Sequence, residues 1–296
     1  MRDDTPSRTA QWVAAARGMS RLLPEAVRIA DDPYGLAFSS SGLADLVNRS
    51  AHGPGSRAEA VARIPGLSTW IVYMQVRTRV IDDAARVFAA AGGRQIIMLG
   101  AGYDCRALRL SELGGAQVYE IDHPATQDHK RKVLAGLGVT SPARYLAWDF
   151  ETRAMDDLPA ALAELGHDPA RPTLTIWEGV TMYLTEGAID ASLGAIATWS
   201  APGSELAMTY QVKSASKKPS LATRAVQAMA RQLGEPFKFG WAPAQLPDYL
   251  EVRGFHLVRD VAIASAARDL LPASLAALLS RTEDHVAFAR STARVA

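Results

Sequence analysis

The sequence has few of the features that define several large protein classes. Its 296 residues include one cysteine, Cys105, which excludes an internal disulfide framework and suits a reducing compartment. No apolar run approaches the roughly 20 residues that a membrane-spanning helix needs, and residues 1–6 are polar and lack the apolar core of a secretory signal. We therefore expect a cytoplasmic protein with no membrane partner.

Strong charge and metal-binding patterns are also lacking. The formal net charge is +1, whereas a dedicated nucleic-acid binder normally has a basic bias, so we expect no nucleic-acid partner. The six histidines form no H-E-x-x-H or comparable cluster, so no metal site is predicted, and no G-x-S-x-G or Walker sequence occurs. The sequence indicates no particular oligomeric state. With 48% apolar residues, the chain can still bury a substantial core.

Regular secondary-structure patterns divide the chain into two parts. Residues 1–92 contain helical patterns at 9–28 and 67–91 and no convincing strand, whereas residues 93–296 alternate strands with helices. The expected strands are 95–100, 117–122, 144–148, 174–178, 205–211, 255–263 and 285–290. The expected helices between and after them are 104–113, 124–137, 155–165, 186–197, 221–233, 243–253 and 270–279. This alternation predicts an α/β fold with a doubly wound, mostly parallel sheet. We expect a helical cap over 1–92, a core over 93–296 and a lid insertion near 213–242.

A glycine turn stands at the centre of the predicted core. The apolar run ending at Leu99 enters Gly100-Ala101-Gly102, and Asp104 then opens an amphipathic segment. A buried strand, a tight turn and a helix start are the elements that bind nucleotides at the carboxyl end of a central strand. Glycines let the backbone bend sharply and let a ligand approach it closely.

Two acidic residues end the next predicted strand. Glu120 and Asp122 are two positions apart, so they should point the same way at its carboxyl end. An acid about 20 positions after a glycine turn is placed to bind ribose hydroxyls. The glycine turn and these two acidic residues together predict a nucleoside ligand.

The choice between nucleosides depends on the start of the helix. A dinucleotide fingerprint needs a third glycine and a phosphate at the helix N-terminus. Here Cys105 takes the place of that glycine. The Asp104 carboxylate would repel a phosphate, but it could cap the helix or accept a hydrogen bond from an amine. The pattern favours S-adenosylmethionine over NAD.

The third and fourth predicted strands end in further candidate residues. Asp149 could hydrogen-bond the adenine amino group while Phe150 packs on the ring, although strand-end aspartates are also common turn formers. Glu178 ends the fourth strand, close to the glycine turn. A carboxylate buried there needs a partner such as an ammonium group.

Five motifs, in this order and spacing, resemble the leucine carboxyl methyltransferase-like family of S-adenosylmethionine-dependent O-methyltransferases. They are Val76-Arg-Thr-Arg79, Leu99-Gly-Ala-Gly-Tyr-Asp104, Tyr119-Glu-Ile-Asp-His-Pro124, Asp149-Phe150 and Glu178-Gly-Val-Thr-Met-Tyr-Leu184. The resemblance is good from about residue 32 to 184 and looser in the last third. It implies a class I methyltransferase sheet of seven strands with the last one antiparallel.

The resemblance also implies roles for individual residues. Arg77 would contact the methionine carboxylate, Gly100 the methionine end, Asp122 the ribose, Asp149 and Phe150 the adenine, and Glu178 the ammonium. The family commonly has leucine where this chain has Phe150 and threonine where it has Cys105. Neither departure removes a charged contact to the cofactor.

The function expected from these observations is in-line methyl transfer to oxygen, with S-adenosylhomocysteine as product. An acceptor carboxylate, on a small molecule or a peptide C-terminus, would already be ionised near neutral pH, whereas a hydroxyl would need a base that the sequence does not nominate. Tyr183 and Arg77 are the residues predicted to act in catalysis. Two alternatives stay open at this point: an NAD-dependent oxidoreductase, and a protein that binds the cofactor without transferring its methyl group.

Overall fold

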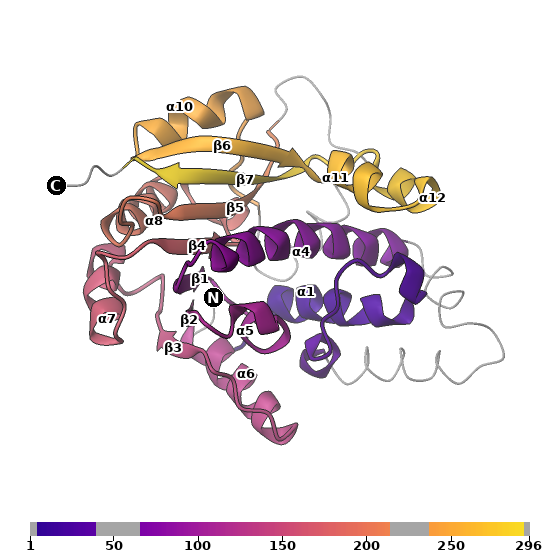
Figure 1. Cartoon of the computed structure of the whole chain (residues 1–296), viewed down its shortest axis with the longest axis horizontal. Helices are drawn as coiled ribbons and strands as arrows, with labels where there is room; N and C mark the ends of the chain where they lie inside the picture. Colours follow the sequence, from indigo (N-terminus) through magenta and orange to yellow (C-terminus); the bar gives the residue numbers. More distant parts are fainter. Residues whose placement is uncertain (1–4, 40–65, 214–236, 293–296) are drawn as a thin grey trace.

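A seven-stranded sheet organises the protein, seen in a computed structural model that describes residues 5–39, 66–213 and 237–292. The strand order is β3-β2-β1-β4-β5-β7-β6, so β1 lies at the centre (Figure 1). Strands β1 to β5 are parallel, and β7 is antiparallel to both β5 and β6. The strands are β1 (Gln95–Leu99), β2 (Gln117–Asp122), β3 (Arg144–Ala147), β4 (Thr173–Trp177), β5 (Glu205–Gln211), β6 (Phe255–Ala262) and β7 (Asp284–Ser291). The predicted fold class, including the antiparallel last strand, is confirmed.

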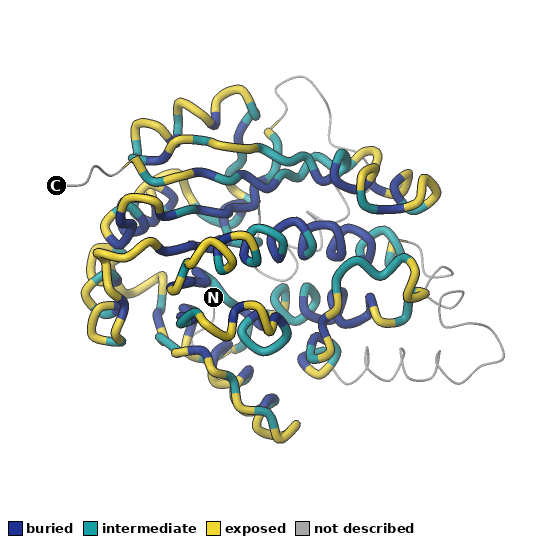
Figure 2. The backbone as a smooth tube through the Cα atoms, in the orientation of Figure 1, coloured by how far each residue is buried: buried dark blue, intermediate teal, exposed yellow. Residues whose placement is uncertain are grey.

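Helices cover both faces of this sheet. The α-helices are α1 (Arg8–Met19), α4 (Leu67–Ala90), α5 (Arg106–Arg109), α6 (Pro124–Gly136), α7 (Leu158–Glu164), α8 (Glu186–Thr198), α10 (Leu246–Glu251), α11 (Ile263–Leu270) and α12 (Ala273–Ala276). Alternate residues of each central strand face opposite layers. In β1, Ile96 and Met98 pack with α4 and α11, whereas Ile97 and Leu99 pack with α7, α8 and α10. Every residue of β1 and β4 is therefore buried (Figure 2), which explains the continuous apolar run from Ile96 to Leu99 in β1.

Helix α4 is the element that joins the N-terminal segment to the sheet. It spans 24 residues and has an apolar stripe that packs on the sheet. Its first half lies near the carboxyl ends of the parallel strands, because Arg77 bonds Glu178 just after β4. Its last turn lies at the opposite edge, where Phe88 packs over Gly93, two residues before β1. Two charged side chains, Arg77 and Asp82, are buried on this helix and anticipate the polar site described below.

Several predicted helices are shorter than expected. The helix predicted over 9–28 ends at Met19, and two 3-10 turns, Ser20–Leu22 and Glu25–Val27, follow on either side of Pro24. Leu23 is extended because it precedes that proline. The helix predicted over 270–279 begins later for the same reason: Leu271 precedes Pro272 and is extended, which separates α11 from α12. From there α12 and a 3-10 turn, Ala277–Leu279, fill the rest of the predicted range. The helix predicted over 104–113 is reduced to α5, since Leu110 has extended backbone angles, and a 3-10 turn, Ser111–Leu113, completes the connection.

Part of the predicted organisation falls outside the described residues. The helix predicted over 221–233 and most of the insertion near 213–242 belong to that part. The described N-terminal residues pack closely: a Cβ added to Gly35 would lie 2.3 Å from the Ala14 carbonyl oxygen of α1. The division into a cap over 1–92 and a core over 93–296 stays a prediction.

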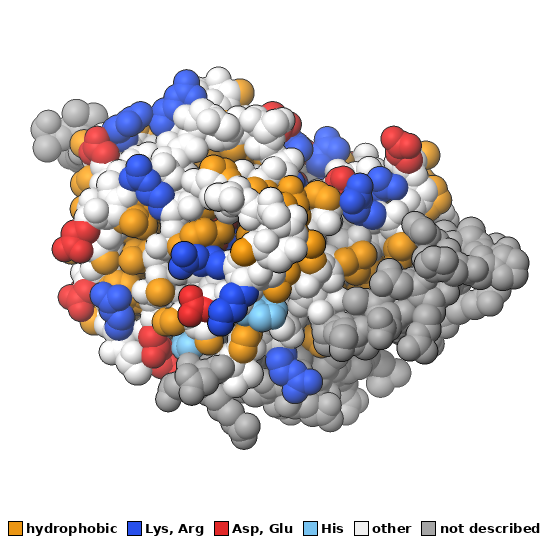
Figure 3. Space-filling model, turned by 90° about the horizontal axis from the view of Figure 1, so that it is seen from below, with side chains coloured by type: hydrophobic (Ala, Val, Ile, Leu, Met, Phe, Trp, Pro, Cys, Tyr) orange, Lys and Arg blue, Asp and Glu red, His pale blue; other side chains and the backbone are white. Residues whose placement is uncertain are grey.

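Charges of both signs are dispersed on the visible surface. Figure 3 shows basic and acidic side chains scattered among hydrophobic ones on the face seen from below. Among the described helices, none is long and apolar enough to cross a membrane.

Candidate functional site

The glycine turn after β1 forms the floor of the site. Gly100 and Gly102 have positive φ angles of 71° and 52°, which glycine adopts without strain. A Cβ on Gly100 would also lie only 2.6 Å from Cγ2 of Val180, so space as well as conformation requires glycine there. The Gly100 and Ala101 N–H groups both donate to the Ile121 carbonyl of β2, at 2.9 and 3.0 Å. The turn is therefore held against the end of the neighbouring strand.

Asp122, at the end of β2, makes the side-chain link to this turn. Its Oδ2 accepts from the Gly102 N–H at 2.6 Å, and its Oδ1 accepts from the His123 N–H at 2.7 Å. Burial raises the pKa of Asp122, and these two N–H groups oppose the shift. Each carboxylate oxygen has two lone pairs, so each can still accept one hydroxyl. The structure thus joins two predicted motifs at one point.

Glu120 has a partner inside the protein. Its carboxylate is 1% exposed and bonds the Lys130 ammonium, which also donates to the Asp104 carbonyl and lies 5.9 Å from the ring centre of Tyr145. Burial raises the pKa of Glu120 to about 7 although Lys130 opposes the shift. Among the described residues, its Oε1 has no hydrogen-bond partner. Glu120 is thus already paired with Lys130 inside the protein, and the predicted ribose contact stays a prediction.

Glu178 lies between two arginines. Its Oε1 accepts from Nε of Arg77 at 2.8 Å, and its Oε2 accepts from Nη1 of Arg106 at 2.7 Å. The side chains of Arg77, Arg106 and Glu178 are 4%, 0% and 8% exposed. Burial alone would raise the pKa of Glu178, but Arg106 and Arg77 together hold it well below its usual range. The sequence correctly implied that a buried Glu178 requires a cationic partner.

Asp104 belongs to the same network rather than standing alone. Its Oδ1 accepts from the Arg106 N–H at 2.7 Å, at the start of α5, and its Oδ2 bonds the Arg106 guanidinium. Burial would raise the pKa of Asp104, but Arg106 and Arg17 hold it below its usual range. Asp104 thus accepts from the first N–H of α5, although the N-cap position itself is Cys105.

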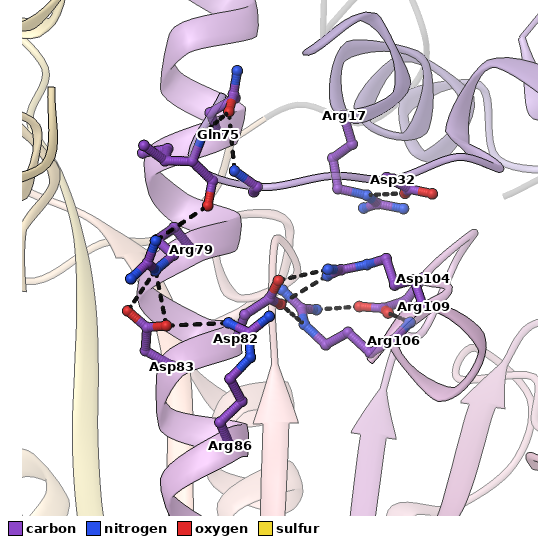
Figure 4. Close-up of polar contacts among 12 residues, drawn as sticks. Arg17, Asp32, Gln75, Arg79, Asp82, Asp83, Arg86, Asp104, Arg106 and Arg109 are labelled. Atoms are coloured by element: carbon purple, nitrogen blue, oxygen red, sulfur yellow. Dashed lines mark hydrogen bonds and ion pairs between the residues drawn. The ribbon is translucent and has the colours of Figure 1, made fainter. Parts of the chain in front are cut away.

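The network extends to residues that the sequence did not reveal. Arg106 Nε donates to Asp82 of α4 at 2.7 Å, and Arg109 donates to the same carboxylate at 2.5 and 2.7 Å (Figure 4). Arg17 of α1 bonds Asp32 at 2.9 Å and the Tyr103 carbonyl at 2.6 Å. The available signal was Asp82 itself: a carboxylate on the apolar stripe of a helix must find a cation.

The residues predicted for adenine lie at the end of β3, away from this network. Asp149 accepts from the Glu151 N–H at 2.9 Å and from the Thr152 hydroxyl at 2.7 Å, which lowers the pKa of Asp149. It is therefore a turn former here, the alternative that the sequence had left open. Phe150 is 37% exposed and is free to pack on a flat ring. Their contacts to adenine stay predictions.

Tyr183 follows β4 in a 3-10 turn, Thr181–Tyr183. Its ring lies 5.3 Å from that of Phe237, edge to face. The same segment is fixed to β5 by Thr209, which accepts from the Gly179 N–H and, through its carbonyl, from the Thr181 hydroxyl, both at 2.7 Å. Tyr183 thus lies beyond the end of β4, five residues after Glu178.

Other chemistry finds little support in the described residues. Within the described ranges no group of three metal-ligating side chains occurs. Cys105 is buried, and burial raises the pKa of its thiol to about 12, so it packs rather than reacts.

The site has the features that a polar nucleoside ligand needs. Backbone turns at Gly100 and Gly102 allow close approach, and acidic side chains lie on β2 and directly after β4. The buried polar atoms without a hydrogen-bond partner within the described part of the chain include Arg106 Nη2, Arg109 Nε and Glu120 Oε1. These residues fit the donor that the sequence favoured.

Comparison with known proteins assigns the family. The model of the leucine carboxyl methyltransferase family matches residues 10–197. A Mycobacterium marinum protein named "Putative S-adenosyl-L-methionine-dependent methyltransferase" is 35% identical over 84% of this chain and 82% of its own length. A Mycolicibacterium vanbaalenii protein of the same name is 36% identical over 68% of this chain, and the match spans 65% of that relative.

Solved structures share the fold. A DUF574 family protein from Streptomyces avermitilis aligns over 98% of this chain and 99% of its own, with a TM-score of 0.61 and 17% identity. A Thermobifida fusca protein aligns over 98% and 96%, with a TM-score of 0.57 and 19% identity. The NAD alternative gains no support from these matches, and S-adenosylmethionine, the methyl donor of the matched relatives, is the predicted cofactor. The chain therefore belongs to the leucine carboxyl methyltransferase family of S-adenosylmethionine-dependent methyltransferases.

Proposed function

We propose that this protein transfers a methyl group from S-adenosylmethionine to an oxygen acceptor, a carboxylate or hydroxyl of a small molecule or a peptide C-terminus. The observation that carries the proposal is the buried ion pair of Arg77 and Glu178 beside the glycine turn. The methionine end of the donor carries one carboxylate and one ammonium. These two groups are the charge complements of Arg77 and Glu178.

Arg77 and Glu178 suit an exchange of partners. In the free protein the two side chains neutralise each other, which avoids the large cost of an unpaired buried charge. When the methionine end enters between them, its carboxylate pairs with Arg77 and its ammonium pairs with Glu178. One ion pair is thus replaced by two, and the net charge of the site does not change. Arg106 keeps its bond to Glu178 throughout and holds this carboxylate ionised.

The remaining contacts follow from position along the sheet edge. The backbone of Gly100, Ala101 and Gly102 would run along the methionine end. Asp122, together with Glu120 on the same strand, would accept hydrogen bonds from the ribose hydroxyls. Asp149 and Phe150, one strand further, would meet the adenine.

The residues act in the reaction by alignment and exclusion of water. The bound sulfonium supplies an electrophilic methyl carbon. Arg77 and Glu178 fix the methionine end, and the buried surroundings limit water, which can lower the barrier by several kcal/mol. We place Tyr183 on the acceptor side.

Calorimetry tests the proposal. S-adenosylmethionine should bind the wild-type protein and NAD should not. Glu178→Ala leaves Arg77 and Arg106 without their shared carboxylate and should weaken binding by about 2–5 kcal/mol, roughly 30-fold or more. Glu186→Ala, at an exposed position in the first turn of α8, is the matched control and should bind as the wild type does. NAD binding without a response to S-adenosylmethionine would overturn the assignment.

A second measurement separates an enzyme from a silent binder. Wild-type protein is incubated with S-adenosylmethionine and a library of carboxylic acids, phenols and alcohols, and S-adenosylhomocysteine is quantified. Acceptor-dependent formation supports methyl transfer. Intact donor binding without product from any member of the library contradicts it.

A further inference from the structure

A cavity lies at the edge of the sheet opposite the proposed donor site. It has a volume of about 240 Å³ and is bounded by the last turn of α4 and by the residues at the starts of β1, β4 and β5. Because these three strands are parallel, their starts share one edge, whereas the glycine turn and Glu178 follow their ends (Figure 1). Arg77 near the donor site and Phe88 in the cavity are separated by about 16 Å along the axis of α4. A ligand in this cavity would therefore leave the donor site free.

Hydrogen bonds hold the wall formed by β4 and β5 in place. Gln95, which is 3% exposed, donates to the Asp168 carbonyl and accepts from the Asp168 N–H, both at 2.8 Å. This pair of bonds fixes the loop before β4, which carries Arg171 into the cavity wall. At the start of β5, the Ser204 hydroxyl accepts from the Thr173 N–H of β4 at 3.0 Å. The wall is thus preformed, and a ligand would pay little to order it.

The floor of the cavity is apolar. Phe88 packs over Gly93, whose N–H donates to the Phe88 carbonyl at 2.9 Å. Val87, which also lines the cavity, is 68% exposed, and Pro172 lines it from the side of β4. Apolar surface that is open to water gains free energy when an apolar ligand covers it. The floor therefore suits the flat, apolar body of a small molecule.

The charges around this floor favour an anion. Arg94 and Arg171 both line the cavity and are exposed. Arg94 donates to the Gly115 carbonyl at 3.4 Å, a long contact that leaves its guanidinium with further donors for a ligand. Glu205 also lines the cavity, but its carboxylate is paired with Arg290 at 3.3 Å. Guanidinium groups bind carboxylates through two parallel hydrogen bonds, so these two arginines are suited to a carboxylate.

We propose that this cavity is a second binding site, and that its ligand is a small organic anion with a flat, apolar body, of the class of aromatic carboxylates. The body of the ligand would cover Val87, Phe88 and Pro172, and its carboxylate would bind Arg94 and Arg171. An inorganic anion would leave the apolar floor uncovered, and a cation would be repelled by both arginines. The site is separate from the methyl donor and does not depend on the function proposed above.

Calorimetry with cinnamate tests the site. This probe joins a flat apolar body to one carboxylate, and cinnamyl alcohol is its neutral analogue of similar size. Each probe is titrated into the wild-type protein with and without saturating S-adenosylhomocysteine. We expect cinnamate to bind with a dissociation constant on the order of 0.1–1 mM, about tenfold more tightly than cinnamyl alcohol, and equally well in both states of the protein.

Two variants at exposed positions assign the binding to this cavity. Arg171→Ala removes one cation and should weaken cinnamate binding about fivefold, as expected for an exposed ion pair, without changing the affinity for cinnamyl alcohol. Ala91→Glu places a carboxylate on the cavity wall at the end of α4, where it competes for the arginines, and should abolish cinnamate binding. Arg268→Ala is the matched control, because Arg268 is an exposed arginine on α11 outside the cavity, and it should bind cinnamate as the wild type does.

Each contrary result has a distinct meaning. A dissociation constant for cinnamate above about 10 mM, equal affinity for the two probes, or wild-type affinity for cinnamate in Ala91→Glu overturns the proposal. Weakening in Arg268→Ala equal to that in Arg171→Ala overturns it as well. Loss of cinnamate binding in the presence of S-adenosylhomocysteine also contradicts it, because cinnamate would then occupy the donor site. If S-adenosylhomocysteine itself does not bind, the function proposed above fails, whereas the titrations without it still decide whether this second site exists.

Discussion

Arg106 shows how a single buried cation can organise several elements. It contacts Asp82 on α4, Asp104 beside the glycine turn and Glu178 after β4. A guanidinium can do this because its donors form a planar fork, whereas an ammonium offers a point charge. Arg106 therefore fixes the distance between the three segments that surround the proposed methionine site.

Removal of Arg106 should destabilise the protein strongly. Arg106→Met keeps much of the volume but leaves three carboxylates short of a partner, and breaking a buried ion pair costs about 3–5 kcal/mol. Urea unfolding at pH 7 measures the loss. Arg290→Met is the control, because Arg290 is 57% exposed and forms a surface pair with Glu205 at 3.3 Å, which should be worth about 1 kcal/mol or less.

The pH dependence of the loss in unfolding free energy separates the contribution of the ion pairs from that of side-chain packing. In the wild type the pKa values of Asp104 and Glu178 are lowered, so their stabilisation is complete above the unfolded-state pKa values of about 4 and is lost as the pH falls through the folded-state values. In Arg106→Met these carboxyls should protonate more readily. The difference in unfolding free energy from the wild type should therefore shrink between pH 7 and pH 4. A difference independent of pH would assign the loss to packing alone.

At the scale of elements, the glycine turn depends on its fit against the segment after β4. Gly100 has a φ of 71° and no room for a Cβ beside Val180, whereas Gly138 has a φ of 69° and no atom within 4 Å of an added Cβ. Both alanine variants carry the conformational cost of a positive φ, about 1–2 kcal/mol. Only Gly100→Ala adds a clash, so it should be less stable than Gly138→Ala and should also weaken S-adenosylhomocysteine binding. Equal affinities in the two variants would show that the turn does not shape the donor site.

Elements and contacts differed in how far the sequence could predict them. Strand positions were close to those observed because buried strands and glycine turns are local signals. The helix breaks before Pro24 and Pro272 were also local, and the proline rule could have placed them. The partners of Asp82 could not be found in this way: Arg106 and Arg109 are 24 and 27 residues away. Such pairings exist only after α4 has packed on the sheet, and no spacing in the sequence encodes them.

At the scale of the whole molecule, the N-terminal helix is joined to the donor site. A Cβ on Gly102 would lie 3.2 Å from Ala10 of α1, Arg17 of α1 donates to the Tyr103 carbonyl, and the Ser7 N–H donates to the Thr126 hydroxyl of α6 at 3.1 Å. Helix α1 thus covers the turn that we assign to the methionine end. Ligand binding should therefore reduce local opening of α1, although this helix supplies none of the proposed cofactor contacts.

Hydrogen exchange followed by mass spectrometry tests this coupling. Saturation with S-adenosylhomocysteine should stabilise the bound state by mass action, by about 2.7 kcal/mol at 100 times the dissociation constant. Local openings that release the ligand should slow by a similar free energy, so exchange should slow in α1 as well as in the glycine turn. Helix α10 packs on the other face of the sheet and serves as the internal control with little change. Slower exchange in the glycine turn without any change in α1 would mean that α1 opens independently of the donor site.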